Sequence, residues 1–139
     1  MNPYGSKRCR PANASGLRRP SPRWLRRVVF ALVVALSVIV LFAPGSDVPA
    51  APAGTDKLVH FALFAALGAS AWWAGLSVPL LVPLLLGYAG ASELLQTIPA
   101  LHRDGSGWDF LTDAVGLAAG LAAPFVLAQI TRLAGRRWR

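Results

Sequence analysis

The amino-acid sequence predicts an all-α integral membrane protein: a four-helix bundle with both termini in the cytoplasm and a disordered basic arm at its amino-terminal end. Three observations lead to this fold class. First, 55% of the 139 residues are hydrophobic and only 14% are charged, whereas about one quarter of the residues of a soluble protein are charged. Second, the basic residues gather at the two ends of the chain. Third, the apolar residues between those ends form runs long enough to cross a membrane.

The formal net charge of +8 is distributed unevenly along the chain. Residues 1–27 carry eight of the fourteen Lys and Arg residues, residues 132–139 carry four, and neither segment holds an acid. The remainder holds Lys57 and Arg103 against all six acids. Because the basic residues flank apolar runs instead of covering one folded face, we expect no nucleic-acid partner. Cys9 is the only cysteine, which excludes an internal disulfide framework.

Four apolar runs can each form a membrane-spanning helix. A helix rises about 1.5 Å per residue, so about 20 residues cross a hydrocarbon core of about 30 Å. Pro44, the turn at 75–79 and Pro99 separate the runs, because proline ends or kinks a helix. Pro83 and Pro124 lie inside two runs, and both predict bends. The predicted spans are about 25–43, 57–76, 78–98 and 108–131.

Three segments follow from this organisation: a disordered basic cytoplasmic arm (1–23), a membrane domain (24–132) and a basic cytoplasmic tail (133–139). Lys and Arg are enriched in cytoplasmic flanks, which predicts a multi-pass protein of the cytoplasmic membrane with both termini inside. The loops at 44–57 and 99–107 are then outside. The alternative is a cleaved secretory signal, because Ala51-Pro52-Ala53 follows the first run. Cleavage would leave three spans.

Ionisable residues within the predicted spans lie at a similar depth. At 1.5 Å per residue, His60, Glu93 and Asp113 each lie about 5–8 Å below the outer end of their helix. Such residues are costly in a membrane and mark paired, wet or functional positions. We therefore predict an outward-facing polar pocket with Lys57 and Arg103 at its mouth. The predicted binding residues are Asp56, Lys57, His60, Glu93, Gln96, Arg103, Asp109 and Asp113.

Small residues accompany these polar residues on the same helix faces. At 100° per residue, Gly116 and Gly120 lie on one stripe with Asp113, and Gly90 lies near Glu93. Small residues let helix backbones approach each other in a membrane. We therefore predict that these three glycines serve helix packing and that the stripe faces other helices.

The polar residues also allow other interpretations. In a purely structural one, pairs such as Glu93 with His60, or Arg103 with Asp109, hold the helices together. Three carboxyl groups in one region exceed what such pairing requires, which favours a functional role. A divalent metal held by His60, Glu93, Asp109 and Asp113 is a further interpretation. With one imidazole and no H-E-x-x-H spacing, the sequence favours no metal and no cofactor.

The polar residues fall into three blocks in the central part of the chain. The blocks are Asp56-Lys57-x-x-His60-Phe61, Glu93-x-x-Gln96-x-x-Pro-x-x-x-Arg103 and Asp109-x-x-x-Asp113-x-x-Gly116-x-x-x-Gly120. In order and spacing they resemble the VanZ-like family of small bacterial membrane proteins, over about residues 55–120. The family usually has Asn at the position of Asp113, so this chain adds a carboxyl group. The resemblance implies a cell-envelope protein, since the founding member is associated with reduced sensitivity to the glycopeptide teicoplanin.

The predicted function is binding of an envelope component or a lipid-linked head group, with an effect on glycopeptide sensitivity. The partners are membrane lipids and a lipid-linked envelope precursor or glycopeptide-related ligand; the oligomeric state is left open. Lys57 and Arg103 would attract phosphate or carboxylate, and Gln96 would orient the ligand. The alternative is an acid/base enzyme acting on a lipid-linked substrate at the outer leaflet, with Glu93 and His60 as candidate catalytic residues. A proton-coupled transporter is less favoured, because all the acids lie in the outer half.

Overall fold

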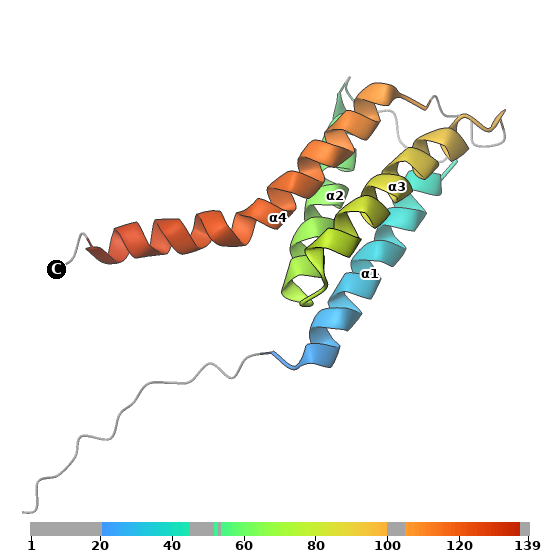
Figure 1. Cartoon of the computed structure of the whole chain (residues 1–139). Helices are drawn as coiled ribbons and strands as arrows, with labels where there is room; N and C mark the ends of the chain where they lie inside the picture. Colours follow the sequence, from blue (N-terminus) through green and yellow to red (C-terminus); the bar gives the residue numbers. More distant parts are fainter. Residues whose placement is uncertain (1–20, 45–51, 53, 100–104, 137–139) are drawn as a thin grey trace, which may run out of the picture.

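The computed structural model describes residues 21–44, 52, 54–99 and 105–136, which form four α-helices and no strand (Figure 1). The helices are α1 (Arg23–Phe42), α2 (Thr55–Trp73), α3 (Val78–Gln96) and α4 (Gly107–Arg136). The all-α prediction is confirmed. Residues 1–20 of the predicted disordered arm (1–23) lie outside the described residues, and Arg23, its last residue, already belongs to α1. Arg103 and the Ala51-Pro52-Ala53 cleavage signal apart from Pro52 also lie outside the described residues.

Prolines and glycines set the helix ends. α1 follows Pro22 and ends at Phe42, because Ala43 precedes a proline and adopts an extended conformation, with φ −60° and ψ 132°. The turn between α2 and α3 contains Gly75 at a φ of 75°, a left-handed conformation that glycine adopts at little cost. Pro79 lies in the first turn of α3, where its missing N–H leaves no hydrogen bond unmade.

α4 is the longest helix and is not straight. Figure 1 shows that it bends partway along and that its carboxy-terminal part leaves the bundle. Pro124 lies inside this helix, and a proline removes one backbone hydrogen bond and crowds the preceding turn. The predicted bend therefore has its expected cause. The helix also continues to Arg136, five residues beyond the predicted end of the span.

Three of the described helices, α1, α3 and α4, are long and apolar enough to cross a membrane. Their outward surfaces carry exposed large apolar side chains such as Ile39, Leu84 and Leu94. A helix that is apolar on all sides is typical of a membrane span or a large core. The structure thus has the helices of a multi-pass membrane protein. α2 is less apolar because its first two turns contain Asp56, Lys57 and His60, and its crossing stays a prediction.

The helices pack in a closed ring. α2 packs against α4 and α1, and α3 packs against α4 and α1, with the most extensive contact between α2 and α4. The apolar side chains buried inside this ring are Leu41, Leu63, Phe64, Leu67, Ala71, Leu81, Leu85, Ala89 and Leu117.

Glycines allow α2 and α4 to touch through their backbones. A Cβ atom on Gly116 would lie 2.5 Å from the carbonyl oxygen of Phe61, and one on Gly120 would collide with the carbonyl oxygen of Ala65. These two glycines lie at the helix contact that the sequence predicted for them. Gly90 differs, because a Cβ there would meet only a ring carbon of α4 at 3.9 Å, an ordinary contact distance.

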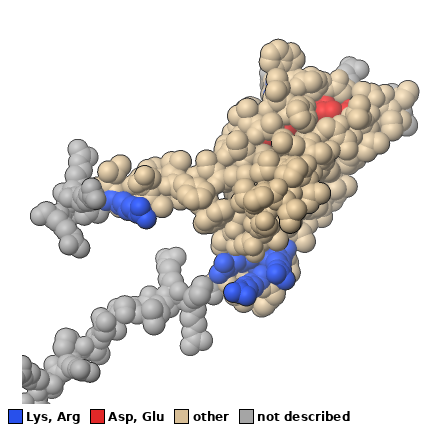
Figure 2. All heavy atoms as spheres, in the orientation of Figure 1, with Lys and Arg blue, Asp and Glu red and all other residues tan. Residues whose placement is uncertain are grey.

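The charged residues separate along the bundle. Figure 2 shows the basic side chains of α1 and of the carboxy-terminal part of α4 away from the acidic side chains, which lie at the other end of the bundle. The described acids belong to the first turns of α2 and α4 and the last turn of α3. The polar site therefore lies at a single end of the ring.

Candidate functional site

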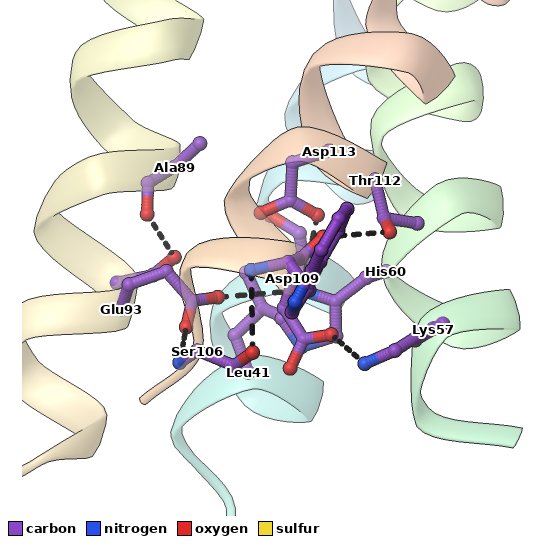
Figure 3. Close-up of polar contacts among 12 residues, drawn as sticks. Leu41, Lys57, His60, Ala89, Glu93, Ser106, Asp109, Thr112 and Asp113 are labelled. Atoms are coloured by element: carbon purple, nitrogen blue, oxygen red, sulfur yellow. Dashed lines mark hydrogen bonds and ion pairs between the residues drawn. The ribbon is translucent and has the colours of Figure 1, made fainter. Parts of the chain in front are cut away.

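Four ionisable side chains from three helices converge at the acidic end of the bundle (Figure 3). α2 contributes His60, α3 contributes Glu93, and α4 contributes Asp109 and Asp113. Each lies in the turns closest to that end because α2 and α4 begin there and α3 ends there. A common end and a fixed rise per residue place the side chains at the same level.

The outer layer of the site is an ion pair. The Lys57 ammonium donates to Oδ1 of Asp109 at 2.7 Å, which joins the first turns of α2 and α4. The Lys57 side chain is 50% exposed, whereas that of Asp109 is 5% exposed. The neighbouring Asp56 is exposed as well. Lys57 therefore places a half-exposed positive charge at the rim of the site. Its ammonium has three N–H donors, so it can contact a ligand while it stays paired with Asp109.

The inner layer is buried and centres on His60. Its Nδ1 lies 3.0 Å from Oδ1 of Asp113 and 3.6 Å from Oε1 of Glu93. The side chains of His60 and Asp113 are 1% and 0% exposed, and that of Glu93 is 11% exposed. Two carboxyl groups thus face one imidazole nitrogen in the interior of the bundle.

Glu93 is also fixed by the segment that leads into α4. Its Oε2 accepts a hydrogen bond from the backbone N–H of Ser106 at 2.7 Å. The preceding Gly105 lies so close to α3 that a Cβ atom there would collide with the carbonyl oxygen of Glu93. This contact was not predicted from the sequence. The only sequence signal for it is Gly105, just before the start of α4.

Three polar atoms of the inner layer are buried without a hydrogen-bond partner among the described residues. They are Nε2 of His60, Oε1 of Glu93 and Oδ2 of Asp113. A buried polar group that lacks a partner costs free energy, and a buried charge costs more. The described part of the chain therefore does not satisfy the hydrogen-bonding capacity of this cluster.

Gln96 makes a contact that was not predicted from the sequence. It is buried, but its amide Nε2 donates to the backbone carbonyl of Leu41 in the last turn of α1 at 2.9 Å. The amide that was expected to orient a ligand therefore ties α3 to α1. Asp109 pairs with Lys57; the pairing of Asp109 with Arg103, an example in the purely structural interpretation, involves a residue outside the described part of the chain.

The predicted open pocket is a closed cluster in the structure. His60, Glu93, Asp109 and Asp113 are all buried, because the helices pack tightly around them. A groove of about 180 Å³ lies nearby between α3 and α4. It is lined only by apolar side chains: Val82, Leu86, Ala114, Leu117, Ala118 and Leu121. One of the lining residues, Ala114, directly follows Asp113 in α4.

Comparison with known proteins gives no match to a protein-family model, to a curated protein or to a solved structure. The resemblance to the VanZ-like family rests on the three sequence blocks and stays a prediction. What the structure defines is a class: a bundle of apolar helices that encloses a histidine and carboxylates at one end.

Proposed function

We propose that the chain is a VanZ-like protein of the bacterial cytoplasmic membrane that binds the polar head group of an envelope component at the outer leaflet. In this proposal all four helices cross the membrane and both termini lie in the cytoplasm. We expect the protein to alter the sensitivity of the cell to glycopeptides. The activity is binding, and the ligand is a lipid-linked precursor.

The charge separation supports the orientation. The described arginines lie away from the acidic end (Figure 2), and cytoplasmic flanks are enriched in Lys and Arg. The acidic end would then face outward. Reporter fusions after Pro52 and after residue 104 test this, and both must report an external location. A cytoplasmic signal at either position would refute the orientation.

The observation that carries the proposal is a continuous polar column into the end of an apolar bundle. It starts at the half-exposed Lys57, passes the buried Asp109 and reaches the fully buried Asp113. Ionisable residues at such positions are retained in membrane proteins mainly at functional sites. The ammonium at the rim suits a phosphate or carboxylate of a head group.

The apolar groove supports a ligand of lipid character. It lies between two helices that are apolar enough to span a membrane, α3 and α4. Its volume of about 180 Å³ fits only part of an acyl chain. A ligand with its head group at Lys57 and the start of a chain in the groove contacts both features. Such a ligand can enter from the lipid phase without crossing water.

The test is the identification of lipids that co-purify with the wild-type chain, followed by the same measurement on two variants. Lys57→Met removes the rim charge and keeps most of the side-chain length, and we expect it to lose the lipid. Thr112→Val serves as the matched control, because the Thr112 hydroxyl bonds only to the carbonyl of Trp108 in its own helix among the described residues. Retention of the same lipid by Lys57→Met would refute the proposal.

A second candidate, an acid/base enzyme, is favoured by the inner layer. The Nδ1 of His60 lies within hydrogen-bond distance of Asp113 and 3.6 Å from Glu93, and such a set of groups can transfer protons. Glu93→Gln is nearly isosteric and distinguishes the two candidates. Loss of turnover with retained lipid binding would support the enzyme, whereas an unchanged phenotype would exclude it.

A further inference from the structure

The inner layer of the polar site has the geometry of a metal centre. Two sets of side chains place one potential ligand atom each within 4.8 Å of one another. One set is Asp56, His60 and Asp109, and the other is His60, Glu93 and Asp113. In the first set, Asp56 is exposed and Asp109 is already paired with Lys57. The second set is buried throughout, and its members come from three different helices.

The distances in the second set fit a small divalent ion. Oδ1 of Asp113 and Oε1 of Glu93 lie 3.0 Å and 3.6 Å from Nδ1 of His60. Two ligands that are each about 2.1 Å from a tetrahedral ion lie about 3.4 Å apart. The observed spacings lie on either side of that value. Two of the three ligand-to-ligand distances therefore lie within about 0.4 Å of the value for one shared ion, and the distance between the two carboxylate oxygens is no more than 4.8 Å.

Independent support comes from the atoms that the protein leaves unpaired. Oε1 of Glu93 and Oδ2 of Asp113 are buried and have no hydrogen-bond partner in the described part of the chain. Two ionised carboxylates beside a neutral imidazole, the protonation state that binds a metal ion, would carry two negative charges. A buried uncompensated charge is strongly unfavourable. One divalent cation would neutralise both carboxylates and supply the missing partner of Oε1.

We propose that His60, Glu93 and Asp113 bind a divalent transition-metal ion, with Zn²⁺ as the best-fitting one. One imidazole and two carboxylates are a mixed nitrogen and oxygen set, which suits Zn²⁺ better than the all-oxygen ions Mg²⁺ and Ca²⁺. Three protein ligands leave a fourth position open, as in zinc sites that bind an exogenous group. The sequence disfavoured a metal because it has a single imidazole there. The structure places two of the carboxyl groups in the sequence-based ligand set, those of Glu93 and Asp113, beside one nitrogen of the imidazole.

This site goes beyond the proposed head-group binding and does not depend on it, because its ligands belong to the protein. A bound ion would nevertheless strengthen that function, since phosphate or carboxylate can occupy the open position of a metal ion. The two proposals fail separately: Lys57→Met is expected to abolish lipid co-purification and to leave metal binding intact, because Lys57 is not in the ligand set.

The experiment measures metal in the full-length protein, purified in mild detergent, stripped with a chelator and titrated with Zn²⁺. We expect one equivalent per chain for wild type, with Mg²⁺ and Ca²⁺ as poor competitors. Asp113→Asn and Glu93→Gln keep shape and remove a charged ligand. Each should weaken binding by more than the roughly 10–100-fold that loss of an outer hydrogen-bonding partner costs. Thr112→Val is the control: its hydroxyl bonds to the carbonyl of Trp108 in its own helix, it belongs to neither ligand set, and it should bind as wild type does.

Two readouts guard against variants that fail to fold. The size-exclusion elution and helical content of each variant are first compared with those of wild type. Co²⁺ is then bound to wild type, and its visible spectrum reports whether the ion has a tetrahedral nitrogen and oxygen environment. A folded wild type that binds no stoichiometric Zn²⁺ would overturn the proposal. Equal Zn²⁺ affinity in wild type and Asp113→Asn would also overturn it, because the bound metal would then be adventitious.

Discussion

The contact between α2 and α4 predicts a sharp difference among glycine-to-alanine substitutions. A Cβ on Gly120 would collide with the backbone oxygen of Ala65, and one on Gly68 would lie 2.8 Å from the backbone oxygen of Leu117. A backbone carbonyl within a helix cannot rotate away as a flexible side chain can. The two helices must therefore move apart to accept the methyl group.

The size of the effect follows from two opposing contributions. Overpacking costs about 1–3 kcal/mol, whereas replacing Gly by Ala inside a helix gains about 1 kcal/mol in helix propensity. The contact is closest for Gly120→Ala, so the cost of overpacking should exceed the gain in helix propensity. We expect a net loss of about 1–2 kcal/mol in the free energy of unfolding. For Gly87→Ala nothing lies within 4 Å of the new methyl group, so only the gain of up to about 1 kcal/mol applies.

The assay is reversible unfolding of the bundle in mixed micelles by increasing fractions of SDS, followed by circular dichroism. Gly87→Ala is the matched control, since it makes the same chemical change in a helix that is apolar enough to span a membrane. The midpoint of Gly120→Ala should lie below that of wild type, and the midpoint of Gly87→Ala should equal or exceed it. Equal midpoints for the two variants would refute the packing argument.

The convergence of the polar residues was predictable because it depends on regular geometry. Fixed rise per residue and the reversal of direction at each turn place His60, Glu93 and Asp113 at one level, whatever the details of packing. The glycine stripe was predictable for the same reason. The angular period of a helix puts Gly116 on the face of Asp113. Only the partner, the α2 backbone at Phe61, needed the structure.

What the sequence could not predict depends on contacts between segments without a fixed period. The N–H of Ser106 reaches Glu93 because the chain passes close over α3 at Gly105. Gln96 turns toward α1 because Leu41 offers a backbone carbonyl there. Neither backbone group is visible as a residue type in the sequence.

The burial of the site also depends on contacts that the sequence could not predict. The sequence places charged groups at one depth, but the space around them depends on how tightly the helices pack. Contact of α2 and α4 through glycine brings His60 and Asp113 to 3.0 Å. This distance excludes water between the two groups and turns the predicted pocket into a buried cluster. Among the described residues, this packing leaves Nε2 of His60, Oε1 of Glu93 and Oδ2 of Asp113 without a hydrogen-bond partner.

Substitutions at two further positions test the contacts that hold the remaining helices. Gln96→Leu removes the amide that donates to Leu41 and should cost about 0.5–2 kcal/mol in the SDS titration, the range for a hydrogen bond between helices in a membrane. Tyr88→Phe removes only the hydroxyl that shares a hydrogen bond with Ser37 at 3.1 Å. The ring keeps its stacking on Phe64, with centroids 5.9 Å apart. We therefore expect a loss of less than about 1 kcal/mol for Tyr88→Phe and of about 3 kcal/mol for Tyr88→Ala, which leaves a cavity. Equal losses of stability for Tyr88→Phe and Tyr88→Ala would mean that the hydroxyl bond to α1 stabilises the bundle and the stacking of the ring on α2 does not.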